Sequence, residues 1–336
     1  MIALVHLVWG PLGPQPLRRF IASYKAHPAG VEHELVVLLN GTKPEASEML
    51  LAELRDVDHR VLTLAQPVQD LAAYRAAAER LEHSQICFLN SYSVILAPAW
   101  LGHLALALDQ PQAGLVGATG SWASVRSAAL NSLFLPNPYR RALPKRSVAA
   151  RELRAVEAEL ATESQGGHAQ PNRSSNASQA APSLWERVSA TVRGLGAMPG
   201  QIVRFPSFPS YHLRTNGFIV DRRLFLSLRT RPLEAKTDAY VMESGYGSFT
   251  GQVLGQGLRA LVVTRDGHAY DHDEWQRSRT LWQGDQENLM IADNQTRIYA
   301  NGGIERRRLL AAFAWGAEAD ARPPARAGDG AEARHV

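Results

Sequence analysis

The first 120 residues alternate between short apolar runs and amphipathic segments, and this alternation constrains the fold more than any other feature. The apolar runs end at turn-forming residues and are typical of strands buried on both faces, as parallel strands under helices are. Strands and helices in this order predict right-handed crossovers and an α/β fold with a mostly parallel sheet flanked by helices. The predicted strands are residues 2–9, 34–39, 60–64, 85–89 and 114–117.

Three of the intervening segments place apolar side chains on a single helical face. Pro16 stands near the start of the first segment, where its missing N–H costs little. Asp70 precedes the second and is predicted to be its N-cap. The three stripes are Leu17, Phe20, Ile21 and Tyr24; Leu71, Tyr74, Ala78 and Leu81; and Leu101, Leu104 and Leu108.

The pattern changes between residues 123 and 205, where polar helical segments surround a stretch with almost nothing to bury. We expect that stretch, residues 163–183, to be disordered. Strand and helix patterns resume at 211–220, so 123–205 is interpreted as an insertion in one domain spanning 1–315. The remaining tail, 316–336, is rich in Ala, Gly, Arg and Pro and is also predicted to be disordered.

Charge and cysteine usage limit the classes of partner. The 36 basic and 32 acidic residues leave a net charge of +4, and the pI near 9.3 suits an anionic partner such as a diphosphate. No basic block with interleaved aromatics is present, so nucleic acid is not expected. The lone Cys87 excludes an internal disulfide and fits a reducing compartment. The apolar N-terminal run is too short for a transmembrane segment, which predicts a soluble, cytoplasmic protein.

The candidate site lies at the ends of the predicted strands. Ligands of parallel α/β sheets bind beyond the carboxyl ends of the strands. Those ends carry Trp9, Asn40 and Asn90, and Tyr92 lies on the same side as Asn90 by alternation. A capping asparagine and a packed tyrosine explain the last two residues equally well.

The order of these elements resembles the GT-A glycosyltransferases, especially the bacterial family 2 group. Residues 70–79 followed by 86–95 resemble their helix-then-strand unit, and 215–222 resembles the segment that leads into their acceptor helix. Glu243-Ser-Gly, followed by a helix and the strand 259–264, resembles their acidic helix start and short strand. This resemblance implies a GT-A-like, Rossmann-like sheet with a helical and partly disordered insertion.

The resemblance covers roughly residues 1–122 and 211–272. It implies transfer of a sugar from a nucleotide-diphosphate donor to a hydroxyl acceptor, in bacterial glycan or polysaccharide synthesis. Glu243 would be the catalytic base, although charge complementarity at a helix start also accounts for it. Thr215 and Asn216 would contact the sugar or the acceptor. The donor-binding candidates are Trp9, Asn40, Asp70, Arg75, Asn90, Tyr92 and Arg214.

The sequence departs from the family at the metal position. The family strand ends in Asp-x-Asp, whose carboxylates hold Mg or Mn, whereas this chain has Asn90-Ser91-Tyr92. The usual carboxylate ligands are therefore absent, and a divalent cation would need ligands from elsewhere. His268 and His272 are weak candidates, since a solvated loop explains them as well.

Two alternatives to a metal-dependent transferase remain open. The donor could bind without metal, through cations such as Arg75, Arg214, Arg222 or Lys236. The chain could also be a non-catalytic nucleotide-sugar-binding or scaffold relative. A nucleotidyltransferase is disfavoured, because prolines within residues 10–19 remove N–H groups that a triphosphate would need.

Overall fold

The computed structural model describes residues 1–130, 203–230 and 236–316, together with positions 152, 155, 158, 159 and 319. The stretch expected to be disordered, 163–183, lies outside the described residues. So do most of the 123–205 insertion and nearly all of the 316–336 tail.

Eight strands form one sheet in the order β11-β10-β6-β9-β4-β1-β2-β3. The strands β3, β2, β1 and β4 pair in parallel, and so do β6 and β10. Between these two groups β9 runs antiparallel to both neighbours, and β11 is antiparallel to β10. The expected α/β fold with a mostly parallel sheet is confirmed. The strands are β1 (Ile2–Trp9), β2 (His33–Asn40), β3 (Arg60–Thr63), β4 (Gln85–Leu89), β6 (Ala113–Gly117), β9 (Gly217–Asp221), β10 (Arg259–Val263) and β11 (Ala269–Tyr270).

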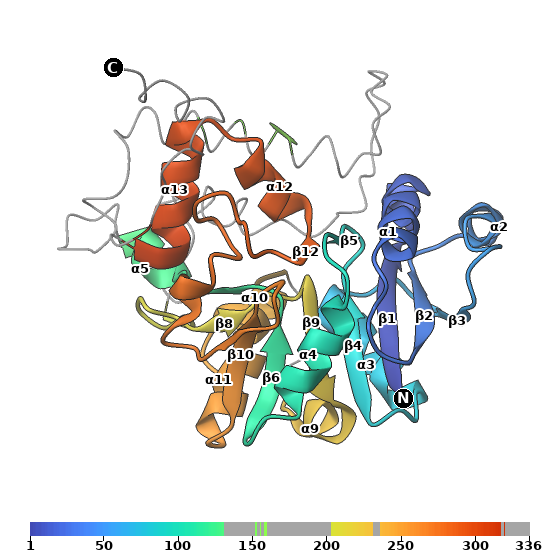
Figure 1. Cartoon of the computed structure of the whole chain (residues 1–336), viewed down its shortest axis with the longest axis horizontal. Helices are drawn as coiled ribbons and strands as arrows, with labels where there is room; N and C mark the ends of the chain where they lie inside the picture. The colour runs from blue at the N-terminus through green and yellow to red at the C-terminus, as the bar shows by residue number, and fades with distance from the viewer. Residues whose placement is uncertain are drawn as a thin grey trace, which may run out of the picture.

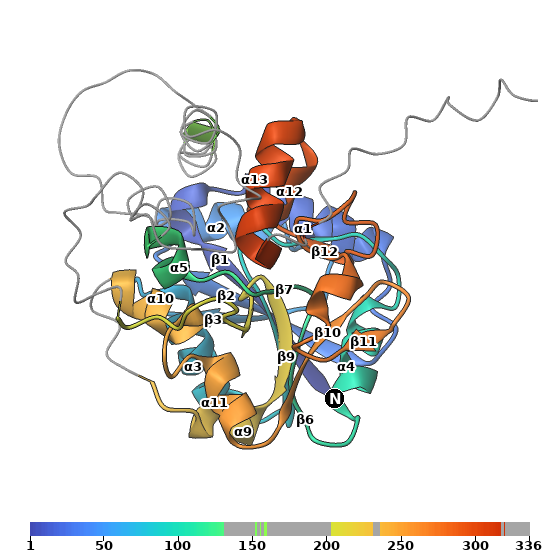
Figure 2. The ribbon, with the colours of Figure 1, turned by 90° about the vertical axis from the view of Figure 1, so that its left-hand side faces the viewer.

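Helices cover both faces of this sheet, so successive side chains along a strand are buried in opposite hydrophobic cores. In β1, Ala3, Val5 and Leu7 face one hydrophobic core, and Leu4 and Val8 face the other. The first core is covered by α3, α9 and α11, and the second by α1 and α4 (Figure 2). These helices are α1 (Gln15–Ala26), α3 (Asp70–Arg80), α4 (Trp100–Leu108), α9 (Arg222–Ser227) and α11 (Phe249–Gly255).

The C-terminal segment, residues 275–316, lies over the carboxyl ends of the parallel strands, opposite the N-terminus of β1 (Figure 1). It is joined to the sheet by a two-stranded pair, β5 with β12, directly after the loop that follows β4. Its three buried tryptophans, Trp275, Trp282 and Trp315, belong to the core that also contains Ala3, Val5 and Leu7 of β1. The remaining elements are η1 (Gly10–Leu12), α2 (Pro44–Ala52), β5 (Val94–Ile95), β7 (Gly120–Ser121), α5 (Val125–Leu130), β8 (His212–Leu213), α10 (Lys236–Ser244), η4 (Trp275–Ser278), β12 (Ile291–Ala292), α12 (Asn294–Ala300) and α13 (Ile304–Trp315).

Two local predictions are wrong. The helix expected to run from Glu243 to about residue 256 is interrupted, because Gly247 has a φ of +81° and Ser248 begins a new helix by accepting from Gly251 N. Glu243 therefore lies in the last turn of α10 and not at a helix start. Asp70 is the first residue of α3, whose N-cap is Gln69.

In the part of the chain that the structure describes, none of the helices combines the length and the apolar character needed to cross a membrane.

His6 occupies the middle of β1 and is completely buried. Its ring stacks on Phe20 of α1, with the ring centroids 3.8 Å apart and an interplanar angle of 6°. Neither ring nitrogen has a hydrogen-bond partner among the described residues. Burial lowers the pKa of His6 to about 3, so the imidazole is neutral in the native state.

Replacing His6 should change how stability depends on pH. The unfolded chain takes up a proton at this histidine below about pH 6.5, and the native protein does not. Native stability should therefore fall between pH 6 and 4 by about 1.4 kcal/mol per pH unit more than that of His6→Phe, which keeps the stacked ring. Urea unfolding of both proteins across this range measures the difference, and equal slopes would contradict the assignment.

Candidate functional site

The loop after β4 is a closed turn attached to the end of β1. Asn90 Oδ1 accepts hydrogen bonds from Tyr92 N and from Ser93 Oγ, both at 3.0 Å. Ser91 Oγ accepts from Trp9 N at 3.0 Å. Asn90 directly follows β4 (Gln85–Leu89) at the carboxyl end of that strand, where it serves as the capping residue of its own loop.

This loop fits a divalent cation poorly. The amide oxygen of Asn90 stands where the resemblance expects a carboxylate, it carries no charge, and it already accepts two hydrogen bonds. Among the described residues, no group of three or more His, Cys, Asp or Glu side chains is placed to hold a metal ion. The ring of His268 packs on Tyr270, and that of His272 on Tyr211, with centroids 4.5 and 4.7 Å apart.

The ends of β1 and β2 present an apolar surface. The indole of Trp9 covers Gly41, where an added Cβ would lie 2.9 Å from the ring and 3.4 Å from Pro67. Asn40 is fully buried beside them. Its Nδ2 donates to Val68 O at 2.8 Å and its Oδ1 accepts from Val68 N at 3.0 Å, so both polar groups hold the loop between β3 and α3.

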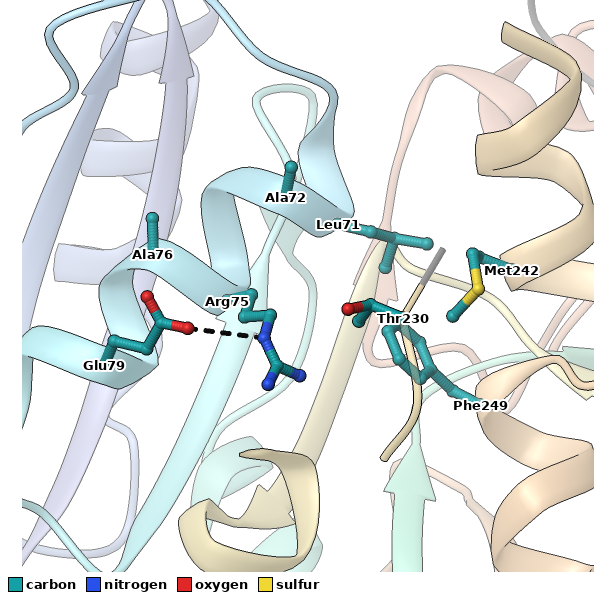
Figure 3. Close-up of a pocket in the computed structure, with 8 residues that line it drawn as sticks. All are labelled: Leu71, Ala72, Arg75, Ala76, Glu79, Thr230, Met242 and Phe249. Carbon is teal, nitrogen blue, oxygen red and sulfur yellow. Dashed lines mark ion pairs between the residues drawn. The ribbon is translucent and has the colours of Figure 1, made fainter. Parts of the chain in front are cut away.

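The first turn of α3 and the last turn of α10 bring two carboxylates together. Asp70 interacts electrostatically with Glu243 and with Tyr74. Partial desolvation of its carboxylate, and secondly the charge of Glu243, raise the pKa of Asp70 to about 6, although the residue still contacts solvent. Leu71 and Met242, the neighbours of these carboxylates in sequence, point toward one another in Figure 3.

The position of Glu243 within α10 has no benefit for helix stability. A carboxylate near a helix C-terminus faces the negative end of the helix dipole. This position is unfavourable by about 0.3–1 kcal/mol, whereas the same charge at the N-terminus would stabilise the helix. Charge complementarity at a helix start, the alternative offered by the sequence, is therefore wrong for this residue.

The turn between β8 and β9 is attached to three other parts of the edge. Tyr74 Oη donates to Thr215 O at 3.3 Å, and Ser93 Oγ donates to Asn216 O at 2.7 Å. Thr119 Oγ1 donates to Asn216 Oδ1, also at 2.7 Å. Burial, and secondly the charge of Asp70, raise the pKa of Tyr74 well above its usual value, so its hydroxyl remains a neutral donor.

A buried ion pair joins this turn to the C-terminal segment. Arg214 Nη2 lies 3.0 Å from Asp293 Oδ2, and both side chains are at most one-tenth exposed. Asp293 is also the N-cap of α12, in a capping box with Thr296. Arg214, Thr215 and Glu243 line one small cavity of about 20 Å³, enough for about one water molecule.

Arg297 is a residue of this edge that the sequence did not indicate. It lies on α12, and its Nη1 donates to Tyr92 O at 3.2 Å, so a positive charge contacts the loop after β4. The helix α12 begins directly after its N-cap Asp293. The capping-box spacing from Asp293 to Thr296 was the available signal for the helix; nothing in the sequence marked Arg297.

Two arginines named by the sequence bind main-chain carbonyls between α3 and α9. Arg75 donates to Leu226 O at 3.0 Å and to Leu228 O at 3.2 Å, and its Nε lies 3.3 Å from Glu79 (Figure 3). It borders a pocket of about 200 Å³ on the outer side of α3. Arg222 Nε donates to Ala78 O at 2.7 Å. The Lys236 side chain lies outside the described residues.

Asp70 provides a test of this electrostatic arrangement. Because its native pKa is raised above the value near 4 of an unfolded aspartate, its ionisation lowers native stability as the pH rises from about 4 to 6. We expect Asp70→Asn to match the native protein at pH 4 and to be more stable at pH 7. The gain should be less than about 1 kcal/mol, because the residue is exposed and water screens its charge.

Urea unfolding at the two pH values measures this gain. Asp56→Asn, which removes an exposed carboxylate 3.8 Å from Lys25, is the matched control and should give no gain at pH 7. A gain for Asp70→Asn that is equal at both pH values would contradict the raised pKa of Asp70.

Comparison with known proteins gives structural neighbours only. No family model matches the chain, and no curated protein matches it. Among solved structures, mannosyltransferase PcManGT from Pyrobaculum calidifontis, in complex with GDP-Man and Mn²⁺, is 11% identical. The match covers 83% of this chain and 61% of that one, with a TM-score of 0.39.

Two further solved structures are similar to parts of this chain. Glucosyl-3-phosphoglycerate synthase from Mycobacterium tuberculosis, with Mn²⁺ and UDP, is 14% identical over 76% of this chain and 63% of that one, with a TM-score of 0.35. TarS from S. aureus is 13% identical over 34% of each chain, with a TM-score of 0.28. The chain thus spans 34% to 63% of the lengths of the three structures. At these identities and TM-scores the three structures assign no family, substrate or reaction to this chain.

Proposed function

We propose that the chain is a glycosyltransferase that moves a sugar from a nucleoside-diphosphate donor to a hydroxyl acceptor, in bacterial glycan or polysaccharide synthesis. One observation carries the proposal: Asp70, Glu243 and the turn at Thr215–Asn216 meet at the carboxyl edge of a mostly parallel sheet. This is the edge where such sheets bind their ligands. The order of motifs that resembles the GT-A enzymes supports the same reaction.

The donor would lie across the ends of β1, β2 and β4. The apolar surface of Trp9, Gly41 and Pro67 suits a nucleobase, which offers flat apolar faces. Asn40 would act indirectly, since both its polar groups hold the loop at Val68. The loop at Asn90–Ser93 would then lie beside the diphosphate.

Glu243 would act as the general base. In this step the acceptor oxygen gives its proton to Glu243 and forms a bond to the anomeric carbon of the donor sugar. The bond from that carbon to the diphosphate oxygen breaks, and the nucleoside diphosphate leaves with the electron pair. A single displacement of this kind inverts the configuration at the anomeric carbon. Asp70 interacts electrostatically with Glu243 and would contact the donor beside the base.

Glu243→Gln tests the proposed base. The amide keeps the shape of the side chain and cannot accept a proton, so kcat should fall by about 10²–10⁴-fold. Donor affinity, measured by calorimetric titration with UDP and GDP, should be nearly unchanged. Glu305→Gln, at a carboxylate in the first turn of α13, is the matched control and should keep full activity. Full activity of Glu243→Gln would remove this residue from the mechanism.

The same titrations distinguish an enzyme from a non-catalytic relative. A transferase should bind nucleoside diphosphates and slowly hydrolyse the nucleotide sugar when no acceptor is present. Binding without turnover, with or without Mn²⁺, would support a scaffold role and contradict the proposed reaction.

A further inference from the structure

We propose that this chain holds the diphosphate of its donor with the side-chain N–H groups of Arg214, Asn216 and Arg297, independently of a divalent cation. The inference rests on the proposed function, because it assumes a nucleoside diphosphate at this edge. It concerns a different property of the site, namely how the negative charge of the ligand is compensated.

Asn216 supplies a buried donor without a partner. The residue is 1% exposed. Its Oδ1 accepts from Thr119 Oγ1 at 2.7 Å, which directs the Nδ2 group the other way. That Nδ2 has no hydrogen-bond partner among the described residues. A buried N–H group without an acceptor is unfavourable, and a ligand oxygen that accepts from it removes the penalty.

Arg214 supplies a second donor of the same kind, two residues away on the same turn. Its Nη2 is paired with Asp293, and the guanidinium carbon lies 5.9 Å from the centre of the Trp282 ring. These contacts fix the plane of the guanidinium. Its Nη1 is buried and has no hydrogen-bond partner among the described residues. A guanidinium with one nitrogen already anchored is preorganised to bind an anion with the other.

Arg297 brings a further positive charge to the loop that would contact the diphosphate. Its Nη1 reaches Tyr92 O at 3.2 Å, from α12 above the strand ends. Ser93 Oγ of the same loop donates to Asn216 O, so Arg297 and the turn at Arg214–Asn216 contact one loop of four residues. Charge-assisted hydrogen bonds from such groups suit phosphate oxygens.

The loop after β4 is unsuited to the alternative, in which a divalent cation compensates the charge of the diphosphate. Mg²⁺ and Mn²⁺ prefer charged oxygen ligands, and Asn90–Tyr92 offers no carboxylate. The amide oxygen of Asn90 is engaged by Tyr92 N and Ser93 Oγ. Nitrogen donors from the turn and from α12 therefore take the place that a cation and its carboxylates would hold.

The first experiment is a calorimetric titration of the unaltered full chain with UDP and GDP, in Mn²⁺ and in EDTA. We expect the Kd of the nucleotide that binds to differ by less than about 2-fold between the two conditions. Affinity at least about 10-fold higher in Mn²⁺ would overturn the inference and leave the proposed function intact. Absence of binding by both nucleotides in both conditions would refute the proposed function itself, and the inference with it.

The second experiment uses Arg297→Gln and Asn216→Asp. Each should weaken nucleoside-diphosphate binding by about 10-fold or more, the range expected for hydrogen bonds to a charged group. Asn216→Asp keeps the oxygen that accepts from Thr119 and turns the free donor into a negative charge. Binding of uridine or guanosine, which lack the diphosphate, should be unchanged in both variants.

Arg308→Gln, at an exposed arginine of α13, is the matched control and should bind like the unaltered chain. Circular dichroism establishes whether each variant is folded. If a variant does not fold, the titration of the unaltered chain in Mn²⁺ and in EDTA still tests the inference. Unchanged diphosphate affinity in both folded variants would overturn the inference.

Discussion

The buried ion pair between Arg214 and Asp293 joins the two parts of the chain from which the site is built. Arg214 belongs to the turn before β9, and Asp293 begins α12 over the strand ends. Removing one member of a buried pair leaves an uncompensated charge, which typically costs about 3–5 kcal/mol. The pair therefore fixes the position of α12, and with it Arg297, relative to the sheet.

Much of the fold could be predicted from the sequence, because strands buried on both faces leave a continuous apolar signal. The runs that became β1, β2, β4 and β6 were placed to within a residue of their observed ends. The break between α10 and α11 was missed, since it depends on a single backbone conformation at Gly247. A local φ of this kind leaves little trace in a hydrophobic pattern.

The candidate site was predictable only in part. Asn90 and Glu243 follow apolar segments and could be found from position alone, but the engagement of Asn40 by Val68 depends on a loop 28 residues away. Arg297 contacts Tyr92 across 205 positions of sequence, and no short-range pattern encodes such a contact. Asp70 could be named from the start of α3, while its interaction with Glu243, 173 residues later in the chain, depends on the tertiary fold.

The reversed direction of β9 has a consequence for where functional residues are sought in such chains. Since β9 runs opposite to β4 and β6, its first residues lie at the edge where its neighbours end. The segment that enters β9 thus occupies the same rim as the segments that leave the parallel strands. A search confined to residues that follow the parallel strands would overlook Arg214 and Asn216, because a single inverted strand contributes its first residues, and not its last ones, to this edge of the sheet.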